Sequence, residues 1–165
     1  MATVAEIMHK EVITVSPRAT LRDLARLLSE AEISGVPVVD NGGSVLGVVS
    51  ATDVLRAASE EDEGLQRALD AVERRGSGYY RDLGRLLSDA ELELLLGNGS
   101  ELDDVMVREI MTTSLLAVEP ALPIPAAARL MSDKHAHRVL VIDNEELVGI
   151  VTAFDMVKAI ADGHV

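Results

Sequence analysis

One segment of the chain occurs twice in the same order, and this internal repeat limits the possible folds more than any other feature. Val4-Ala5-Glu6-Ile7-Met8 returns 103 positions later as Val107-Arg108-Glu109-Ile110-Met111. After the loss of one residue, Gly47-Val48-Val49-Ser50-Ala51-Thr52-Asp53 returns as Gly149-Ile150-Val151-Thr152-Ala153-Phe154-Asp155. A short repeated unit cannot bury its hydrophobic faces alone. The two copies are therefore expected to close a core against each other.

Each copy has the residue pattern of a βαββα unit. Thr20 followed by Asp23 is a helix start with a capping-box-like pair, and leucines at helical spacing follow it. Asn41-Gly42-Gly43-Ser44 separates two apolar runs, which indicates a hairpin. The predicted elements of the first copy are a strand over 12–15, a helix from Thr20, strands over 36–40 and 45–50, and a helix opened by Asp53. The predicted class is α+β, with two tandem βαββα repeats related by a pseudo-two-fold axis.

The repeat divides the chain into a first copy over 1–58, an insert over 59–103 and a second copy over 104–165. The insert holds 12 acidic and 5 basic residues, and its leucines follow a helical period. Helices are expected in it as a continuation of the preceding helix, around 82–87 and over 88–96. Gly76 to Tyr80 lacks the Lys-Ser/Thr ending of a phosphate-binding loop and is interpreted as a turn.

The composition narrows the classes of partner. The net charge is −13, which disfavours a nucleic-acid backbone, and aromatic residues are only 2% of the chain, too few for a base-stacking platform. There is no cysteine, which excludes disulfides and thiol catalysis. The chain shows neither a signal-peptide core nor an apolar run long enough to cross a bilayer, so a cytoplasmic protein without membrane contact is expected.

The strand-to-helix junction of each copy carries a hydroxyl and a carboxylate three residues apart: Ser50 with Asp53, and Thr152 with Asp155. Free backbone N–H groups at a helix start favour an anion such as phosphate. A carboxylate there would repel phosphate and would suit a neutral diol such as a ribose. The alternative is that both pairs simply cap their own helices.

These residues, together with Val36-Pro37-Val38-Val39-Asp40, resemble the cystathionine β-synthase (CBS) domain family, and the two copies resemble a CBS-domain pair. The resemblance covers both copies but not the insert. It implies an allosteric, regulatory module that binds AMP, ADP, ATP or S-adenosylmethionine in two clefts between the copies and has no other cofactor. It also implies a homodimer formed through helices, and a separate protein effector is expected because no effector domain is attached.

The same resemblance assigns site residues. The junction Asp would hold the ribose hydroxyls, and Ser50 or Thr152 would contact phosphate or ribose. Ile13 and Ser34 would face Asp155, whereas Leu116 and His137 would face Asp53. His137-Arg138 resembles the phosphate-binding pair in the gamma subunit of AMP-activated protein kinase. This favours the cleft of Thr152, Asp155, His137 and Arg138 for a phosphorylated ligand; the alternative for Arg138 is a surface ion pair.

Other functions have weaker support. His135 and His137, with Asp133 nearby, have a spacing compatible with a metal on a strand, but no further histidine lies close, so no metal site is predicted. No motif of a known catalytic constellation is present, so the protein is not expected to be an enzyme. The alternatives left open are a ligand-free dimerisation or interaction module and a metal-dependent hydrolase.

Overall fold

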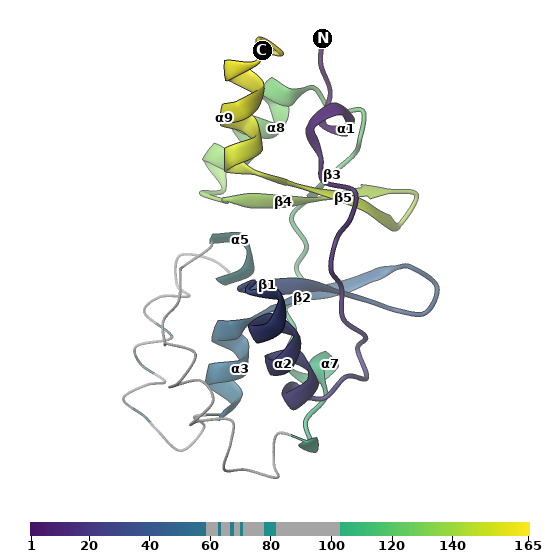
Figure 1. The fold of residues 1–165 in the computed structure, drawn as a ribbon, viewed down its shortest axis with the longest axis vertical. Helices are drawn as coiled ribbons and strands as arrows, with labels where there is room; N and C mark the ends of the chain where they lie inside the picture. Colours follow the sequence, from purple (N-terminus) through teal and green to yellow (C-terminus); the bar gives the residue numbers. More distant parts are fainter. Residues whose placement is uncertain (59–62, 64–66, 68–69, 71–77, 82–102) are drawn as a thin grey trace.

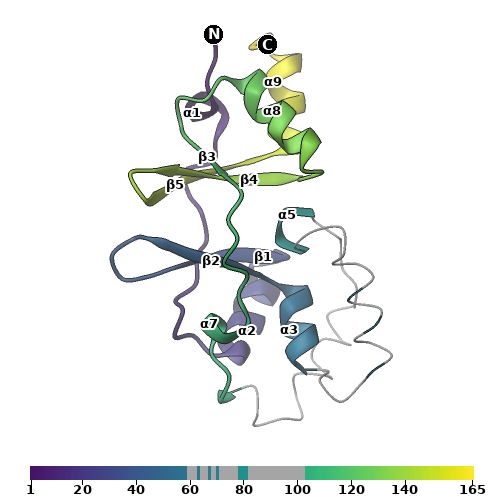
Figure 2. The same ribbon diagram turned by 180° about the vertical axis from the view of Figure 1, so that it is seen from behind.

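The computed structural model describes residues 1–58, 63, 67, 70, 78–81 and 103–165. These residues form four layers, helices, sheet, sheet and helices, with the two sheets facing each other (Figures 1 and 2). The first copy supplies α2 (Leu21–Ala31), β1 (Gly35–Val39), β2 (Val45–Ser50) and α3 (Ala51–Ala58). The second supplies β3 (Ala117–Val118), α8 (Ile124–Asp133), β4 (Arg138–Asp143), β5 (Glu146–Thr152) and α9 (Ala153–Ala161). The predicted α+β class with two repeated units is confirmed.

Each copy has an antiparallel hairpin as its main sheet. Gly35 pairs with Ser50 in one hairpin, and Arg138 pairs with Thr152 in the other. Each ladder shifts register once, at equivalent places between Val38 and Val39 and between Val141 and Ile142. The two hairpins therefore share the position of the register shift as well as the pairing. In each hairpin the first residue of one strand lies next to the strand-to-helix junction.

The expected strand over 12–15 is wrong as an extended element. Only Val15 forms a bridge there, parallel to Val38. Its N–H donates to the carbonyl of Pro37 at 3.0 Å, and its carbonyl accepts from Val39 N at 3.0 Å. Pro17 follows two residues later and has no N–H to continue a ladder. The equivalent strand of the second copy, β3, is also short, with two residues parallel to β4.

The helix starts follow the local sequence. Thr20 is the N-cap of α2 and forms a capping box with Asp23, as predicted. The final helices begin at Ala51 and Ala153, two residues before the expected Asp53 and Asp155. In α9 the reason is that Thr152 serves as N-cap and Asp155 as the third helical residue.

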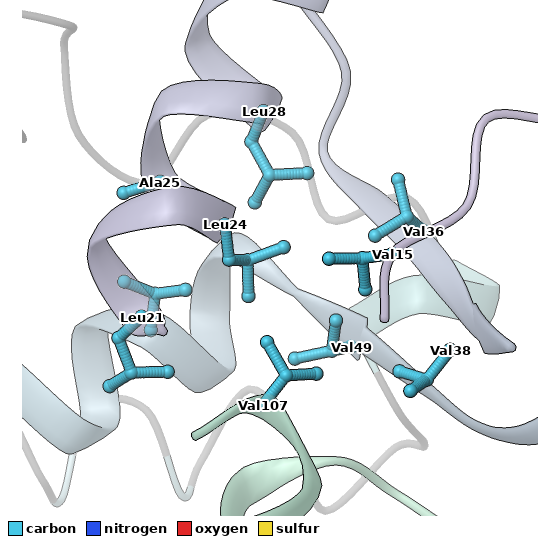
Figure 3. Packing of buried hydrophobic residues seen from close by; sticks show 10 residues of the cluster. Val15, Leu21, Leu24, Ala25, Leu28, Val36, Val38, Val49 and Val107 are labelled. Atoms are coloured by element: carbon cyan, nitrogen blue, oxygen red, sulfur yellow. The ribbon is translucent and has the colours of Figure 1, made fainter. Parts of the chain in front are cut away.

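The short helix at the start of each copy packs in the core of the other copy. In α7 (Val107–Ile110), Val107 packs in the core of the first copy with Leu24 and Val49 (Figure 3). In α1 (Val4–Ile7), Val4 packs in the core of the second copy. The backbone bonds repeat as well, since Val4 N donates to Leu122 O at 2.9 Å and Val107 N donates to Ala19 O at 2.8 Å. Each core is therefore completed by the segment that leads into the other copy.

The insert is described only in part. Of the helix expected beyond Ala58, residues 63, 67 and 70 are described, and all three are helical. The helices expected around 82–87 and over 88–96 lie outside the described residues. The turn expected over Gly76 to Tyr80 is wrong where it can be checked, because Gly78–Arg81 forms the helix α5. This helix lies between the two sheets, at the end where both β2 and β5 lead into their helices (Figure 1). Across the part of the chain that the structure describes, no helix is long and apolar enough to span a membrane.

Candidate functional site

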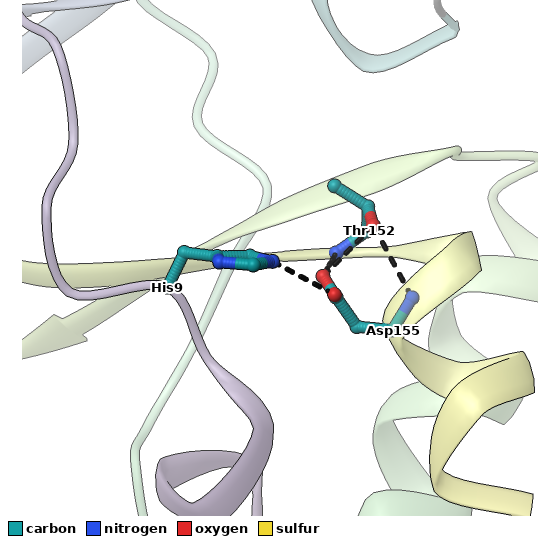
Figure 4. Close-up of polar contacts among 3 residues, drawn as sticks. All are labelled: His9, Thr152 and Asp155. Carbon is teal, nitrogen blue, oxygen red and sulfur yellow. Dashed lines mark hydrogen bonds and ion pairs between the residues drawn. The ribbon is translucent and has the colours of Figure 1, made fainter.

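The junction of the second copy holds its carboxylate in a closed set of hydrogen bonds (Figure 4). Asp155 Oδ2 accepts from the N–H of Thr152 at 2.7 Å and from its hydroxyl at 2.8 Å. The N–H of Asp155 donates back to Thr152 Oγ1 at 3.3 Å. Asp155 is only 9% exposed. The capping interpretation is thus correct for this pair, and the capped carboxylate is buried rather than directed into bulk water.

The junction of the first copy has the same arrangement. Asp53 Oδ2 accepts from the N–H of Ser50 at 2.8 Å and from its hydroxyl at 3.1 Å. Ser50 is 2% exposed, and Asp53 is half-buried. Two hydroxyl–carboxylate pairs with matching geometry therefore lie at the starts of α3 and α9.

His9 is a site residue that the sequence did not reveal. Its Nε2 lies 2.8 Å from Asp155 Oδ1, the carboxylate oxygen that Thr152 leaves unused (Figure 4). The position follows from the backbone, because His9 forms an antiparallel bridge with Ile150 in β5. The side chain of His9 is 64% exposed. A lone histidine 146 positions away carried no sequence signal toward Asp155.

The structure brings some predicted residues together. Arg138 lies beside Thr152 in the β4–β5 ladder, and the carbonyl of His137 accepts from Ala153 N at 2.8 Å. His137 and Arg138 therefore adjoin the junction of their own copy. Ser34 does the same in the first copy, where its carbonyl accepts from Ala51 N at 2.8 Å. The side chain of Ile13 is 46% exposed, on the segment that follows His9.

Helix α5 contributes two buried tyrosines beside these residues. Tyr79 is 1% exposed and Tyr80 is 7% exposed. The Tyr80 hydroxyl accepts from Leu116 N at 2.8 Å, and the Tyr80 carbonyl accepts from His137 N at 2.6 Å. The Arg138 guanidinium carbon lies 5.2 Å from the centre of the Tyr79 ring, within the range of a cation–π contact.

Burial raises the pKa of both phenols. Desolvation raises the pKa of Tyr79 above its ordinary value, and the Arg138 guanidinium offsets part of that rise. Desolvation also raises the pKa of Tyr80, against the opposing effect of the Leu116 N–H bond. Two of the chain's three aromatic residues stand side by side in an otherwise acidic insert. These two adjacent tyrosines were the feature of the sequence that could have indicated burial of this segment.

A cavity of about 480 Å³ lies on the outer side of the second copy, between α8 and the start of α9. It does not include Asp155. Its lining is mainly apolar with two histidines: Ala128, Met131, Ser132, His135, Ala136, His137, Ala153 and Met156. His135 and His137 are exposed there, and within the described ranges no group of three metal-ligating side chains comes together.

Comparison with known proteins agrees with the repeated fold. Residues 4–60 and 107–162 match the CBS domain family. The uncharacterized protein MJ1426 of Methanocaldococcus jannaschii is 27% identical over 162 residues, which are 95% of this chain and 90% of that protein. The chloroplastic CBS domain-containing protein CBSX2 of Arabidopsis thaliana is 27% identical over 95% of this chain and 63% of its own length.

Solved structures show the same fold. The crystal structure of CBSX2 in complex with AMP superposes with a TM-score of 0.66 at 24% identity and covers 100% of both chains. The CBS domain pair of MJ0100, in complex with 5′-methylthioadenosine and S-adenosyl-L-methionine, gives a TM-score of 0.62 at 20% identity, over 98% of this chain and 97% of that chain. Since the family match covers both repeats and most of the chain, this protein is a member of the CBS domain family and contains a pair of its domains.

Proposed function

We propose that this protein is a regulatory module that binds an adenosyl ligand, AMP, ADP, ATP or S-adenosylmethionine, between its two copies. Proteins of this fold accommodate such molecules, since CBSX2 has been crystallised with AMP and MJ0100 with S-adenosyl-L-methionine. The observation that carries the proposal is the buried carboxylate of Asp155, fixed beside a helix start and directed at a side chain from another part of the chain.

The chemistry of this junction suits a ribose. Thr152 holds Asp155 Oδ2, so Oδ1 remains to accept from a ligand hydroxyl once His9 moves away. A carboxylate accepts two or more hydrogen bonds, and bonds to a charged acceptor are among the stronger ones in proteins. Asp155 therefore binds the sugar in this proposal, and it contributes little to binding a phosphate.

Arg138 is the proposed phosphate contact. It is half-buried beside Thr152 in the ladder, so its guanidinium is close to the same junction. In the structure it lies over the Tyr79 ring, and binding a phosphate requires exchange of that contact for one to phosphate oxygens. A guanidinium binds phosphate through two parallel N–H bonds, whereas its contact with a phenol ring is weaker.

Asp155→Asn tests the site with the least disturbance of the helix. Asparagine keeps one oxygen to accept from Thr152 but loses the charge and the second acceptor. Alanine is a poorer choice, because loss of the capping bonds costs about 1 kcal/mol of stability. Calorimetric titration with AMP is expected to show binding by the unaltered protein and at least tenfold weaker binding by the variant.

Asp23→Asn is the matched control, because Asp23 forms the same capping box with Thr20 in α2 but stands at no junction. Equal weakening in both variants would assign the effect to helix capping and would reject the site. A complete absence of heat with AMP, ADP, ATP and S-adenosylmethionine would favour the alternative, a ligand-free dimerisation module.

The proposed output is a population shift. A ligand that contacts both copies favours one of their relative orientations, and a partner that binds that orientation better responds to it. A homodimer through α9 is part of the proposal, because Phe154, Val157 and Ile160 of this helix are 76%, 60% and 63% exposed. Apolar side chains grouped on one helix are typical of an interaction surface.

A further inference from the structure

Helix α5 lies between the two sheets, next to the strand-to-helix junction of the first copy (Figure 1). It contacts β1, β2 and β4 and the helix α3, whose first turn carries Asp53. Both views of the ribbon place it between the sheets, beside the two junctions (Figures 1 and 2). Residues 78–81 of the insert therefore lie in the region between the two copies.

Tyr80 accepts hydrogen bonds from the backbone N–H groups of Leu116 and His137. These are the two residues that the resemblance places opposite Asp53. Leu116 N–H donates to the Tyr80 hydroxyl at 2.8 Å, and His137 N–H donates to the Tyr80 carbonyl at 2.6 Å. These donors come from two separate segments, one before β3 and one before β4. A base in the cleft of Asp53 would need the space and the donors that Tyr80 already uses.

Tyr79 closes the neighbouring space. A Cβ atom at Gly35 would lie 2.8 Å from Tyr79 Cδ2 and 2.9 Å from Val49 O, so the ring fits only because this position has no side chain. On the opposite side the ring contacts the Arg138 guanidinium. Gly35 and Arg138 are equivalent positions in the two copies, and the ring packs between them.

We infer that Tyr79 and Tyr80 act as a tethered substitute for a ligand in the cleft of Asp53, so that each chain takes one adenosyl ligand, in the cleft of Asp155. The inference rests on the proposed function for the cleft of Asp155. It explains how two nearly identical junctions serve different purposes: one receives the ligand and the other receives the chain's own insert. Release of α5 opens the second cleft, which makes the insert an intramolecular competitor.

The test is the number of AMP molecules bound per chain, measured by calorimetry on the full chain. The unaltered protein is expected to bind one. The double variant Tyr79→Ala/Tyr80→Ala is expected to bind two, and the added site is expected to disappear when Asp53→Asn is combined with it. Asp155→Asn in the same background is expected to remove the other site.

Each alternative result has a defined meaning. Two sites in the unaltered protein, one of them lost with Asp53→Asn, would overturn the inference, and so would a single site in the double variant. No binding by the unaltered protein but one Asp53-dependent site in the double variant would reject the proposed function of Asp155 and support the role of α5. No binding by either protein would overturn both.

Tyr80→Phe provides a test without ligand and keeps the volume of the ring. It removes only the acceptor of Leu116 N–H, and a neutral hydrogen bond of this kind corresponds to about a fivefold change in equilibrium. Hydrogen exchange of the Leu116 amide is expected to accelerate about fivefold, while the Leu140 amide, which donates to Leu116 O, is unchanged. Unchanged exchange at Leu116 would overturn the placement of Tyr80 in this cleft.

Discussion

At the scale of single residues, His9 and the proposed ligand compete for one carboxylate oxygen of Asp155, Oδ1. Asp155 caps α9 through Oδ2 and contacts His9 through Oδ1. A ribose can use Oδ1 only if the His9 ring leaves. Since the His9 side chain is 64% exposed, it can swing into solvent without opening a core. The equivalent of His9 in the second copy is Thr112, which forms a bridge with Val48 of the first copy and cannot supply an imidazole.

His9→Ala is therefore expected to strengthen AMP binding by about fivefold, since a net hydrogen bond of about 1 kcal/mol no longer has to be broken. Calorimetry measures the change, and His164→Ala, at an exposed position near the C-terminus, serves as the control. Weaker binding by His9→Ala would show that the imidazole contacts the ligand rather than competing with it.

At the scale of elements, the two copies are joined by exchanged segments as well as by the contact between their sheets. Val4 is fully buried in the core of the second copy, although it stands at the start of the first copy in sequence. Val107 has the matching place in the core of the first. Removing α1 would therefore leave a hole in the second copy, and removing α7 would leave one in the first.

Val4→Ala is expected to lower the free energy of unfolding by about 2 kcal/mol, because buried methyl groups are lost and a cavity remains. Denaturant titration measures this, with Val165→Ala as a control at a position 59% exposed. Hydrogen exchange is expected to accelerate in β4 and β5 before β1 and β2. Faster exchange in β1 and β2 alone would contradict the assignment of Val4 to the second core.

At the scale of the whole molecule, the outer helices leave an apolar face uncovered. Phe154, Val157 and Ile160 lie on α9, on the side of its sheet that faces away from the first copy (Figure 1). The chain carries a net charge of −13, so self-association works against charge repulsion, and burial of this apolar surface would offset it.

Phe154→Asp is expected to dissociate the proposed homodimer into monomers, since it places a charge in the apolar face of α9. Light scattering coupled to size-exclusion chromatography measures the mass. Leu115→Asp is the control, because Leu115 is 36% exposed and lies outside the helices. A mass that stays dimeric in Phe154→Asp, or one that is monomeric before any substitution, would argue against the α9 interface.

The sequence alone determined the features that depend on local order. The duplication revealed two equivalent units, and the spacing of Thr20 with Asp23 predicted a capping box that the structure contains. The resemblance to the CBS domain family was found from the same repeated residues. Such features are readable because turns, caps and hairpins are formed by residues close together in the chain.

Only the tertiary structure decided which distant residues meet. His9 reaches Asp155 across 146 positions, Val4 fills the core of the second copy, and Tyr80 binds the backbone of Leu116 and His137. None of these contacts leaves a periodic pattern, because each depends on how two sheets and a returning insert are placed in space. For the same reason two junctions that look alike in sequence have different neighbours, His9 at Asp155 in the second copy and α5 beside β2 and α3 in the first.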